Sequence, residues 1–298
     1  MTTSEERIAY TKIELDAIRK AYTLLQDTDF CKGNKRDSAL SEKEISKRHL
    51  AITVIVSKCR PEEAAAKYLE WLQGLSPWGI EEFNEEQLIN PPKRSDIYLQ
   101  SYKVAGKDTN DTRIFWIDAE KSIPNDPEEE KMAVYAGIRY HMAVHACANT
   151  VRNGLTFVID VSNKSKEKIG NEKRLQKSHN GYPLRPQHIF IVGSSKVIRV
   201  SVNSILKVTS LVSKAKILKR IKFVTLDQLV DTKNGGTIPS ESLPCHLNGR
   251  SNLDDLMANV NISEEMKEDQ KIPVGEDNGL KIVDWVNQRI AQIPMPDI

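Results

Sequence analysis

Apolar positions in the first quarter of the chain recur with helical spacing. Residues 4–26 carry isoleucine, leucine and tyrosine at three- and four-residue intervals between charged positions, which predicts an amphipathic helix. A serine and a glutamate at the start of 41–56 match a capping box and predict a second helix. A third helix is expected from Pro61 to about Gly74. Residues 1–76 are therefore predicted to form an all-helical N-terminal domain.

The pattern changes after the two prolines at positions 91 and 92. Amphipathic helices are expected over 131–152 and 197–221, and short runs rich in β-branched and aromatic residues predict strands at 113–118, 155–161, 188–192 and 222–226. The run LTFVIDV at 155–161 is almost entirely apolar, which is typical of a strand covered on both faces. Strands that alternate with helices predict an α/β domain with a mostly parallel sheet over residues 90–250.

The last part of the chain, residues 251–298, reads as a separate tail. Its first half is acidic and polar, whereas 279–293 has apolar residues at helical spacing. The pattern leaves two roles open for this C-terminal helix. It could dock on the body of the protein, or it could bind a protein partner.

Charge and cysteine content exclude several partners. The chain has 43 Lys and Arg against 41 Asp and Glu, so its formal net charge is +2 and whole-chain electrostatics predict no partner. Aromatic residues make up 6% and do not interleave with basic runs, which argues against nucleic acid. The four cysteines form no CxxC pair, and the polar N-terminus has no apolar signal core. We therefore expect a soluble protein of the cytoplasm.

Nucleotide-binding and hydrolase motifs are missing. The sequence contains no GxGxxG, no GxxxxGK[ST] and no GxSxG, so we predict no catalytic residue and no cofactor. Asp118 and Asp160 each end a predicted strand, but capping the next segment is a far commoner role for such carboxylates than catalysis. His141 and His145 lie four apart in HMAVH, a spacing that can hold a metal, yet the metalloprotease glutamate is replaced by Met142. We predict a structural role for both histidines and no metal.

Basic residues cluster at the end of the long segment 197–221. Five lie within nine positions: Lys214, Lys216, Lys219, Arg220 and Lys222. Lys216 and Arg220 would share one face of a helix, where like charges repel unless an anion sits between them. Arg185, just before a predicted strand, supplies a guanidinium suited to phosphate. A solvated basic face is the alternative interpretation.

The order of these pieces resembles the CRAL-TRIO family of lipid-binding proteins. The similarity is carried by EEAAAKYLEW, RNGLTFVID, YPLRPQHIFIV, LKRIKFV and IPSESLPCHLNG, at residues 62–71, 152–160, 182–192, 218–224 and 238–249. The resemblance implies an N-terminal helical layer and a mostly parallel sheet that floors an apolar pocket. It also implies a gate helix near 196–212, lined by Val197, Ile198, Val202, Ile205, Leu206 and Leu211.

The same resemblance implies an anion site at the mouth of the gate. Its expected lipid- or phosphate-binding residues are Lys58, Arg185, Lys216, Lys219 and Arg220. In phosphatidylinositol-binding members a glutamate in the YPxR-type turn and a lysine after the gate hold the headgroup. Here Leu184 and Arg220 stand at those positions, and Gln187 replaces a further basic residue.

The expected function is that of a carrier. The protein should bind a hydrophobic small molecule or a phospholipid, associate transiently with anionic membrane surfaces, and exchange its cargo there without making or breaking a bond. The alternative is a non-catalytic signalling or scaffold protein that uses the same fold to bind a protein partner.

Overall fold

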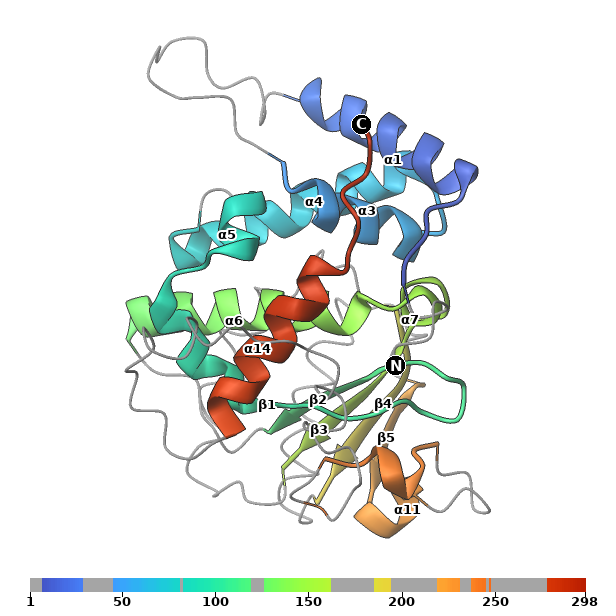
Figure 1. The fold of residues 1–298 in the computed structure, drawn as a ribbon, viewed down its shortest axis with the longest axis vertical. Coiled ribbons are helices and arrows are strands. Elements are labelled where there is room, and N and C mark those ends of the chain that lie inside the picture. The colour runs from blue at the N-terminus through green and yellow to red at the C-terminus, as the bar shows by residue number, and fades with distance from the viewer. Residues whose placement is uncertain are drawn as a thin grey trace.

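A computed structural model of the chain shows its fold (Figure 1). The structure describes residues 7–28, 45–80, 83–118, 126–161, 185–193, 219–230, 237–244, 247 and 278–298. Three levels stack in it (Figure 1). The N-terminal helices lie at one end, a long helix crosses the middle, and a five-stranded sheet lies beyond that helix.

The N-terminal layer consists of α1 (Lys12–Gln26), α3 (Lys47–Val56) and α4 (Pro61–Leu75). A capping box between Thr11 and Glu14 begins α1, and a proline followed by two glutamates begins α4. The side chain of Ser46 caps α3, so this helix begins later than predicted, and residues 41–44 lie outside the described residues. The three predicted helices are confirmed, with revised starts for the first two.

A series of short elements leads from this layer to the sheet. They are η2 (Ser76–Trp78), α5 (Glu85–Ile89) and η3 (Lys93–Ser101). An Asn84–Gln87 capping box begins α5, and η3 packs along the long central helix. None of these elements was expected from the hydrophobic pattern, because each is too short to show a period.

The long central helix is α6 (Pro127–His145), and it is followed by α7 (Ala148–Asn153). The prediction of one helix over 131–152 is wrong at both ends. Asp126 caps α6 through the N–H groups of Glu128 and Glu129, and the chain becomes extended at Cys147. The guanidinium of Arg289 donates to the carbonyl oxygens of Ala143 and Ala146, so a distant part of the chain satisfies the end of α6.

The sheet contains β1 (Tyr102–Lys103), β2 (Ile114–Asp118), β3 (Leu155–Asp160), β4 (Pro186–Val192) and β5 (Ile221–Val224), side by side in chain order. Only β1 is antiparallel to its neighbour, and β2 through β5 are parallel. Helices α6 and α7 form the crossover between β2 and β3. The predicted α/β architecture with a mostly parallel sheet is confirmed.

The described residues after the sheet begin with α11 (Leu226–Val230), which follows β5 directly. The strand expected over 222–226 therefore runs one residue earlier and stops sooner. A short η6 (Ser240–Ser242) lies beside the β1–β2 connection, where the N–H of Gly106 donates to the Ser242 carbonyl oxygen at 2.9 Å. These segments pack on one face of the sheet.

The C-terminal helix α14 (Asn278–Ala291) docks on the body of the protein, which decides between the two roles that its sequence left open (Figure 1). It lies along α6 and η3, and its apolar face joins the main core through Ile282, Val283, Trp285, Val286 and Ile290. Arg139 of α6 is 1% exposed and reaches Asn287 of α14 and Asp96 of η3. A protein partner could therefore use only the other face of α14.

Three histidines are buried where α3 meets α6. His49 lies edge-on against Trp71 at 3.9 Å between ring centroids, and the rings of His141 and His145 are 4.2 Å apart. His145 Nδ1 is 3.0 Å from the His141 carbonyl oxygen. Burial lowers the pKa of His49 to about 3, with a contribution from His145, and burial lowers the pKa of His145 to about 4. Among the described residues no three His, Cys, Asp or Glu side chains lie close enough to hold a metal ion.

Replacement of Trp285 by alanine should lower the free energy of unfolding by about 3–5 kcal/mol, because it opens a cavity in the core beneath α14. Denaturant unfolding measures this loss. Gln288→Ala, on the same helix but only half-buried, serves as the control and should change stability by less than about 0.5 kcal/mol. Equal stability of the two variants would show that α14 contributes nothing to the core.

Stability should fall steeply on acidification below about pH 6.5, the unfolded-state pKa of histidine. The folded-state pKa values of His49 and His145 are lower, so the unfolded chain binds protons more readily and stability is lost as the pH falls toward 4. Each histidine should lower the free energy of unfolding by about 1 kcal/mol for each pH unit of acidification in this range. A His49→Gln, His145→Gln double variant should show a flatter profile below pH 6.5 and the wild-type profile above pH 7. If the slope of unfolding free energy against pH below pH 6.5 is unchanged in this variant, His49 and His145 are not the cause of the acid destabilisation.

Candidate functional site

One face of the sheet presents two rows of apolar side chains. Because the parallel strands are in register, the first row crosses Phe157, Ile189 and Ile221, and the second crosses Ile159, Ile191 and Phe223. All except Ile191 are only half-buried. We call these six residues the floor.

The two faces of the sheet differ in how the described residues cover them. On the face opposite the floor, the core of Trp116, Val158, Phe190 and Val192 is closed by Leu229, Ile238 and Leu243. On the floor side, Val161 and Ile191 form a small cluster with partly buried neighbours, and this cluster is distinct from the main core. The floor is thus a continuous apolar surface that the described helices cover only at the β2–β3 end, where Phe157 contacts Phe115 at 4.4 Å between centroids.

The predicted gate lies outside the described residues. This applies to the whole of its expected lining, Val197, Ile198, Val202, Ile205, Leu206 and Leu211, and also to Lys216. Lys219 and Arg220 form a turn directly before β5, so the expected helix does not extend to Arg220. Lys216 lies outside the described residues, so its predicted i,i+4 relation to Arg220 stays a prediction.

Three of the predicted basic residues, Arg185, Lys219 and Arg220, lie near the amino ends of β3, β4 and β5. Arg185 Nη1 donates to the carbonyl oxygen of Arg152, and its own carbonyl accepts from the N–H of Leu155 at 3.1 Å. Arg220 Nη1 donates to the carbonyl oxygen of Pro186. Each guanidinium uses one of its five N–H donors in these bonds. We call Arg185, Lys219 and Arg220 together the cationic edge.

Arg152, which sequence reasoning missed, links the cationic edge to the N-terminal layer. Its guanidinium donates to both carboxylate oxygens of Glu14, at 2.8 and 3.0 Å, and to the carbonyl of Ala9 at 2.8 Å. Burial alone would raise the pKa of Glu14, but the hydrogen bond and charge of Arg152 and the Thr11 cap hold that pKa below its usual range.

Lys58, the remaining predicted residue, belongs to the N-terminal layer. It follows α3 in a left-handed conformation with φ of 57° and is exposed. Its neighbour Cys59 is close enough to Glu14 and Arg152 for both charges to influence its pKa, which burial raises. Arg185 thus binds the Arg152 carbonyl directly, whereas Lys58 is only a chain neighbour of Cys59.

Gly154 makes the sharp connection between α7 and β3. Its φ is 103°, in the region that glycine favours, and a Cβ at this position would collide with the carbonyl oxygen of Arg185. The same turn exposes the carbonyl of Asn153, to which Gln187 donates. A glycine is therefore required where β3 and β4 begin side by side.

The two aspartates that end strands lie at the opposite, carboxyl edge of the sheet. Asp118 and Asp160 are register partners on β2 and β3. Asp118 pairs with Lys103 at 3.8 Å, and Asp160 is largely buried. Their position separates both carboxylates from the cationic edge by the length of the strands.

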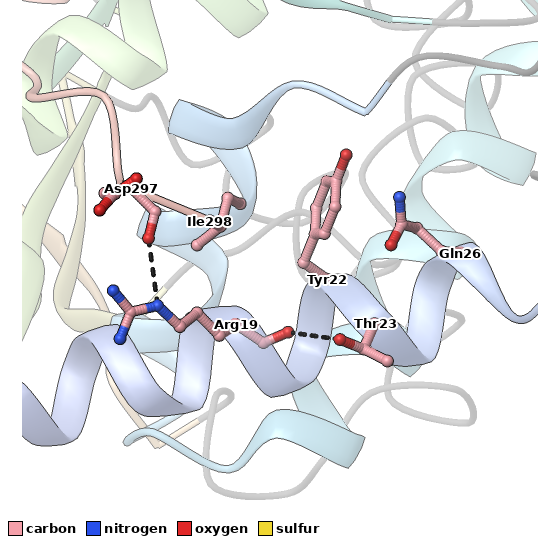
Figure 2. A pocket seen from close by; sticks show the side chains of 6 residues that line it. All are labelled: Arg19, Tyr22, Thr23, Gln26, Asp297 and Ile298. Atoms are coloured by element: carbon pink, nitrogen blue, oxygen red, sulfur yellow. Dashed lines mark hydrogen bonds between the residues drawn. The ribbon is translucent and has the colours of Figure 1, made fainter.

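A hollow of about 430 Å³ lies elsewhere, between α1 and the C-terminal residues (Figure 2). Arg19 Nε donates across it to the carbonyl oxygen of Asp297 at 3.1 Å. The residues around it are Arg19, Tyr22, Thr23, Gln26, Asp297 and Ile298. It lies at the far end of the molecule from the sheet and does not match the predicted lipid pocket (Figure 1).

The sequence pattern contained a signal for the floor. Runs that are apolar at both parities indicate strands with two apolar faces, and 155–161 and 188–192 have that pattern. The polar residues of the cationic edge carry no such signal, because their proximity depends on how the strand ends align.

Comparison with known proteins agrees with this geometry. A family model described as CRAL/TRIO domain matches residues 100–249, about half of the chain and the part that contains all five strands. No curated protein matches the chain. Among the helices that the structure describes, none is both long enough and apolar enough to span a bilayer.

Proposed function

The chain belongs to the CRAL/TRIO domain family, whose domains bind and transfer lipophilic ligands, and from that premise we propose that it carries a lipid in contact with the floor. The observation that supports this most directly is the unbroken apolar surface of Phe157, Ile159, Ile189, Ile221 and Phe223, which is left half-buried. Each Å² of this surface that a cargo removes from water contributes about 25 cal/mol to the free energy of binding.

The floor sets a requirement for the cargo. All six of its side chains are hydrocarbon and offer no hydrogen bond. A polar group of the ligand that lay on the floor would lose its hydration without compensation. A long acyl or isoprenoid chain meets this requirement. The predicted gate, residues 196–212, would cover the cargo from the other side.

We further propose that exchange occurs at anionic membranes through the cationic edge. Arg185, Lys219 and Arg220 lie at the amino ends of neighbouring strands, and Lys216 precedes the edge in sequence. Lys58 follows α3 in the N-terminal layer and is exposed. Each lysine or arginine close to an anionic surface contributes about 1 kcal/mol to the free energy of membrane binding. In this proposal the protein makes and breaks no bond.

The alternative of a protein-binding scaffold is less well supported. Its candidate surfaces were the basic residues and the C-terminal tail. In the tail, the apolar face of α14 packs on α6 and η3 within the chain.

Purified protein should contain a copurified lipid, and Phe223→Asp should reduce its occupancy at least about tenfold, because a carboxylate would have to be desolvated against the cargo. Lipid extraction followed by mass spectrometry measures the occupancy. Thr225→Asp is a charge-matched control: Thr225 is exposed two residues further on and caps α11, a role that aspartate also fills. Wild-type protein without lipid, or equal loss in both variants, would refute a cargo on the floor.

Lys216→Gln combined with Arg220→Gln should weaken binding to anionic vesicles roughly thirtyfold and slow lipid transfer between them, while cargo capacity stays unchanged. Vesicle cosedimentation and a fluorescent-lipid transfer assay measure the two effects. Lys12→Gln with Lys93→Gln removes the same charge from exposed positions in the N-terminal layer and η3. If both pairs behave alike, or if transfer to neutral vesicles is equally fast, the cationic edge is only a solvated surface.

A further inference from the structure

Residues 293–298 leave the end of α14 and run across the N-terminal layer toward α1 (Figure 1). We call them the IPMPDI segment. Ile293 and Pro296 are buried, whereas Met295 between them is exposed. Buried positions three apart match the polyproline II helix, which has three residues per turn. Prolines at 294 and 296 favour that conformation, because each fixes its own φ and biases the preceding residue toward extended backbone.

Two donors on the α1 side bind the main chain of the IPMPDI segment. The hydroxyl of Tyr10, just before α1, donates to the carbonyl oxygen of Pro294 at 2.8 Å. Within α1, Arg19 Nε donates to the carbonyl oxygen of Asp297 at 3.1 Å. Proline has no N–H, so a proline-containing chain is held by donors that reach its carbonyl groups.

Two donors of α3 bind the same segment. Arg48 Nε donates to the carbonyl oxygen of Ile293 at 2.8 Å, and the same guanidinium is fixed by an ion pair with Glu85 at 2.9 Å. Lys47 Nζ lies 3.4 Å from the main-chain oxygen of Ile298. The segment is therefore bound through its main chain by both α1 and α3.

Aromatic side chains and a hollow extend this surface. Tyr10 and Tyr22 are half-buried and pack against the main core, and Lys47 Nζ lies 5.8 Å from the centroid of the Tyr22 ring. The hollow of about 430 Å³ begins beside Ile298 and extends along α1 past Tyr22 to Gln26 (Figure 2). A peptide longer than the IPMPDI segment could continue into it.

These features suit recognition of a polyproline II peptide. Proline-rich segments dock on surfaces lined with aromatic side chains, and their preformed conformation lowers the entropy lost on binding. Binding through carbonyl groups does not depend on the exposed side chains of the peptide. Another peptide with an apolar residue and a proline three positions apart would therefore present the same groups as Ile293 and Pro296.

We propose that α1 and α3 form a docking surface for a protein partner that presents a proline-containing extended segment, and that the IPMPDI segment occupies this surface in cis until the partner displaces it. The tether through α14 gives the segment an effective concentration on the order of millimolar, so it masks the surface from weak competitors. The surface lies at the opposite end of the molecule from the sheet (Figure 1), so the inference is independent of the lipid cargo and of membrane docking.

The test uses the full chain and a fluorescent peptide, AQIPMPDI, that corresponds to residues 291–298. Pro296→Lys in the chain should raise the affinity for this peptide at least about tenfold, because a cation is disfavoured in the buried position and the chain's own segment leaves the surface. Fluorescence anisotropy measures the affinity. Met295→Lys adds the same charge at a position that is 46% exposed and should bind the peptide as weakly as wild type does.

The docking surface is tested in the Pro296→Lys background. Tyr10→Phe should weaken peptide binding about fivefold, because one hydrogen bond to a carbonyl is lost. Tyr98→Phe removes a hydroxyl from a half-buried tyrosine of η3 and should have no effect. A peptide with both prolines replaced by alanine should bind about fivefold more weakly or worse, because it is less preorganised.

A measurement on the wild-type chain keeps the proposal testable if Pro296→Lys does not fold. Excess peptide, at about millimolar concentration, should move the NMR signal of the Met295 methyl group to its position in the free peptide as the segment is displaced. The proposal is overturned if this signal does not move, if Pro296→Lys and Met295→Lys bind the peptide alike, or if Tyr10→Phe has no effect. Dimerisation of the wild-type chain that Pro296→Lys abolishes would make a second copy the occupant and would overturn it as well.

Discussion

Parallel pairing of β2 to β5 in register is the constraint on which the rest of the structure depends. Register places residues of the same parity on the same face, so Phe157, Ile189 and Ile221 form one apolar row. A slip by one residue would exchange the two faces and place His188 in the floor. The same pairing aligns the amino ends of three strands, and this alignment collects Arg185, Lys219 and Arg220 from segments far apart in sequence.

Guanidinium groups hold the helical body around the sheet. Arg139 joins α6 to both η3 and α14, while Arg289 donates to the carbonyls at the end of α6. Arg152 ties the sheet to the first helix through Glu14, and Arg185 in turn binds the Arg152 carbonyl. Arginine suits such junctions because its planar group carries several donors in fixed directions. As a result, the N-terminal layer, the cationic edge and the C-terminal helix are joined through a few side chains.

This organisation brings two kinds of chemistry to one edge of the sheet. The floor is hydrocarbon and half-buried, and the strand ends beside it carry cations that are half-buried or exposed. A lipid has the same division between an apolar chain and a polar headgroup. The buried histidines and the hollow beside α1 belong to other parts of the molecule and are not needed for this arrangement.

The sequence by itself determined the elements whose period is long enough to detect: the amphipathic helices α1 and α4, the strand runs at 113–118 and 155–161, and the order that resembles CRAL/TRIO domains. Local pattern is sufficient there because side-chain periodicity follows directly from backbone geometry. Only the tertiary structure decided that α6 ends at His145, that Arg220 lies in a turn, and that α14 joins the core. Each of these depends on groups distant in sequence, such as Arg289 on the Ala146 carbonyl, 143 positions away. Such contacts leave no period in the chain, because they depend on how separate elements meet in space.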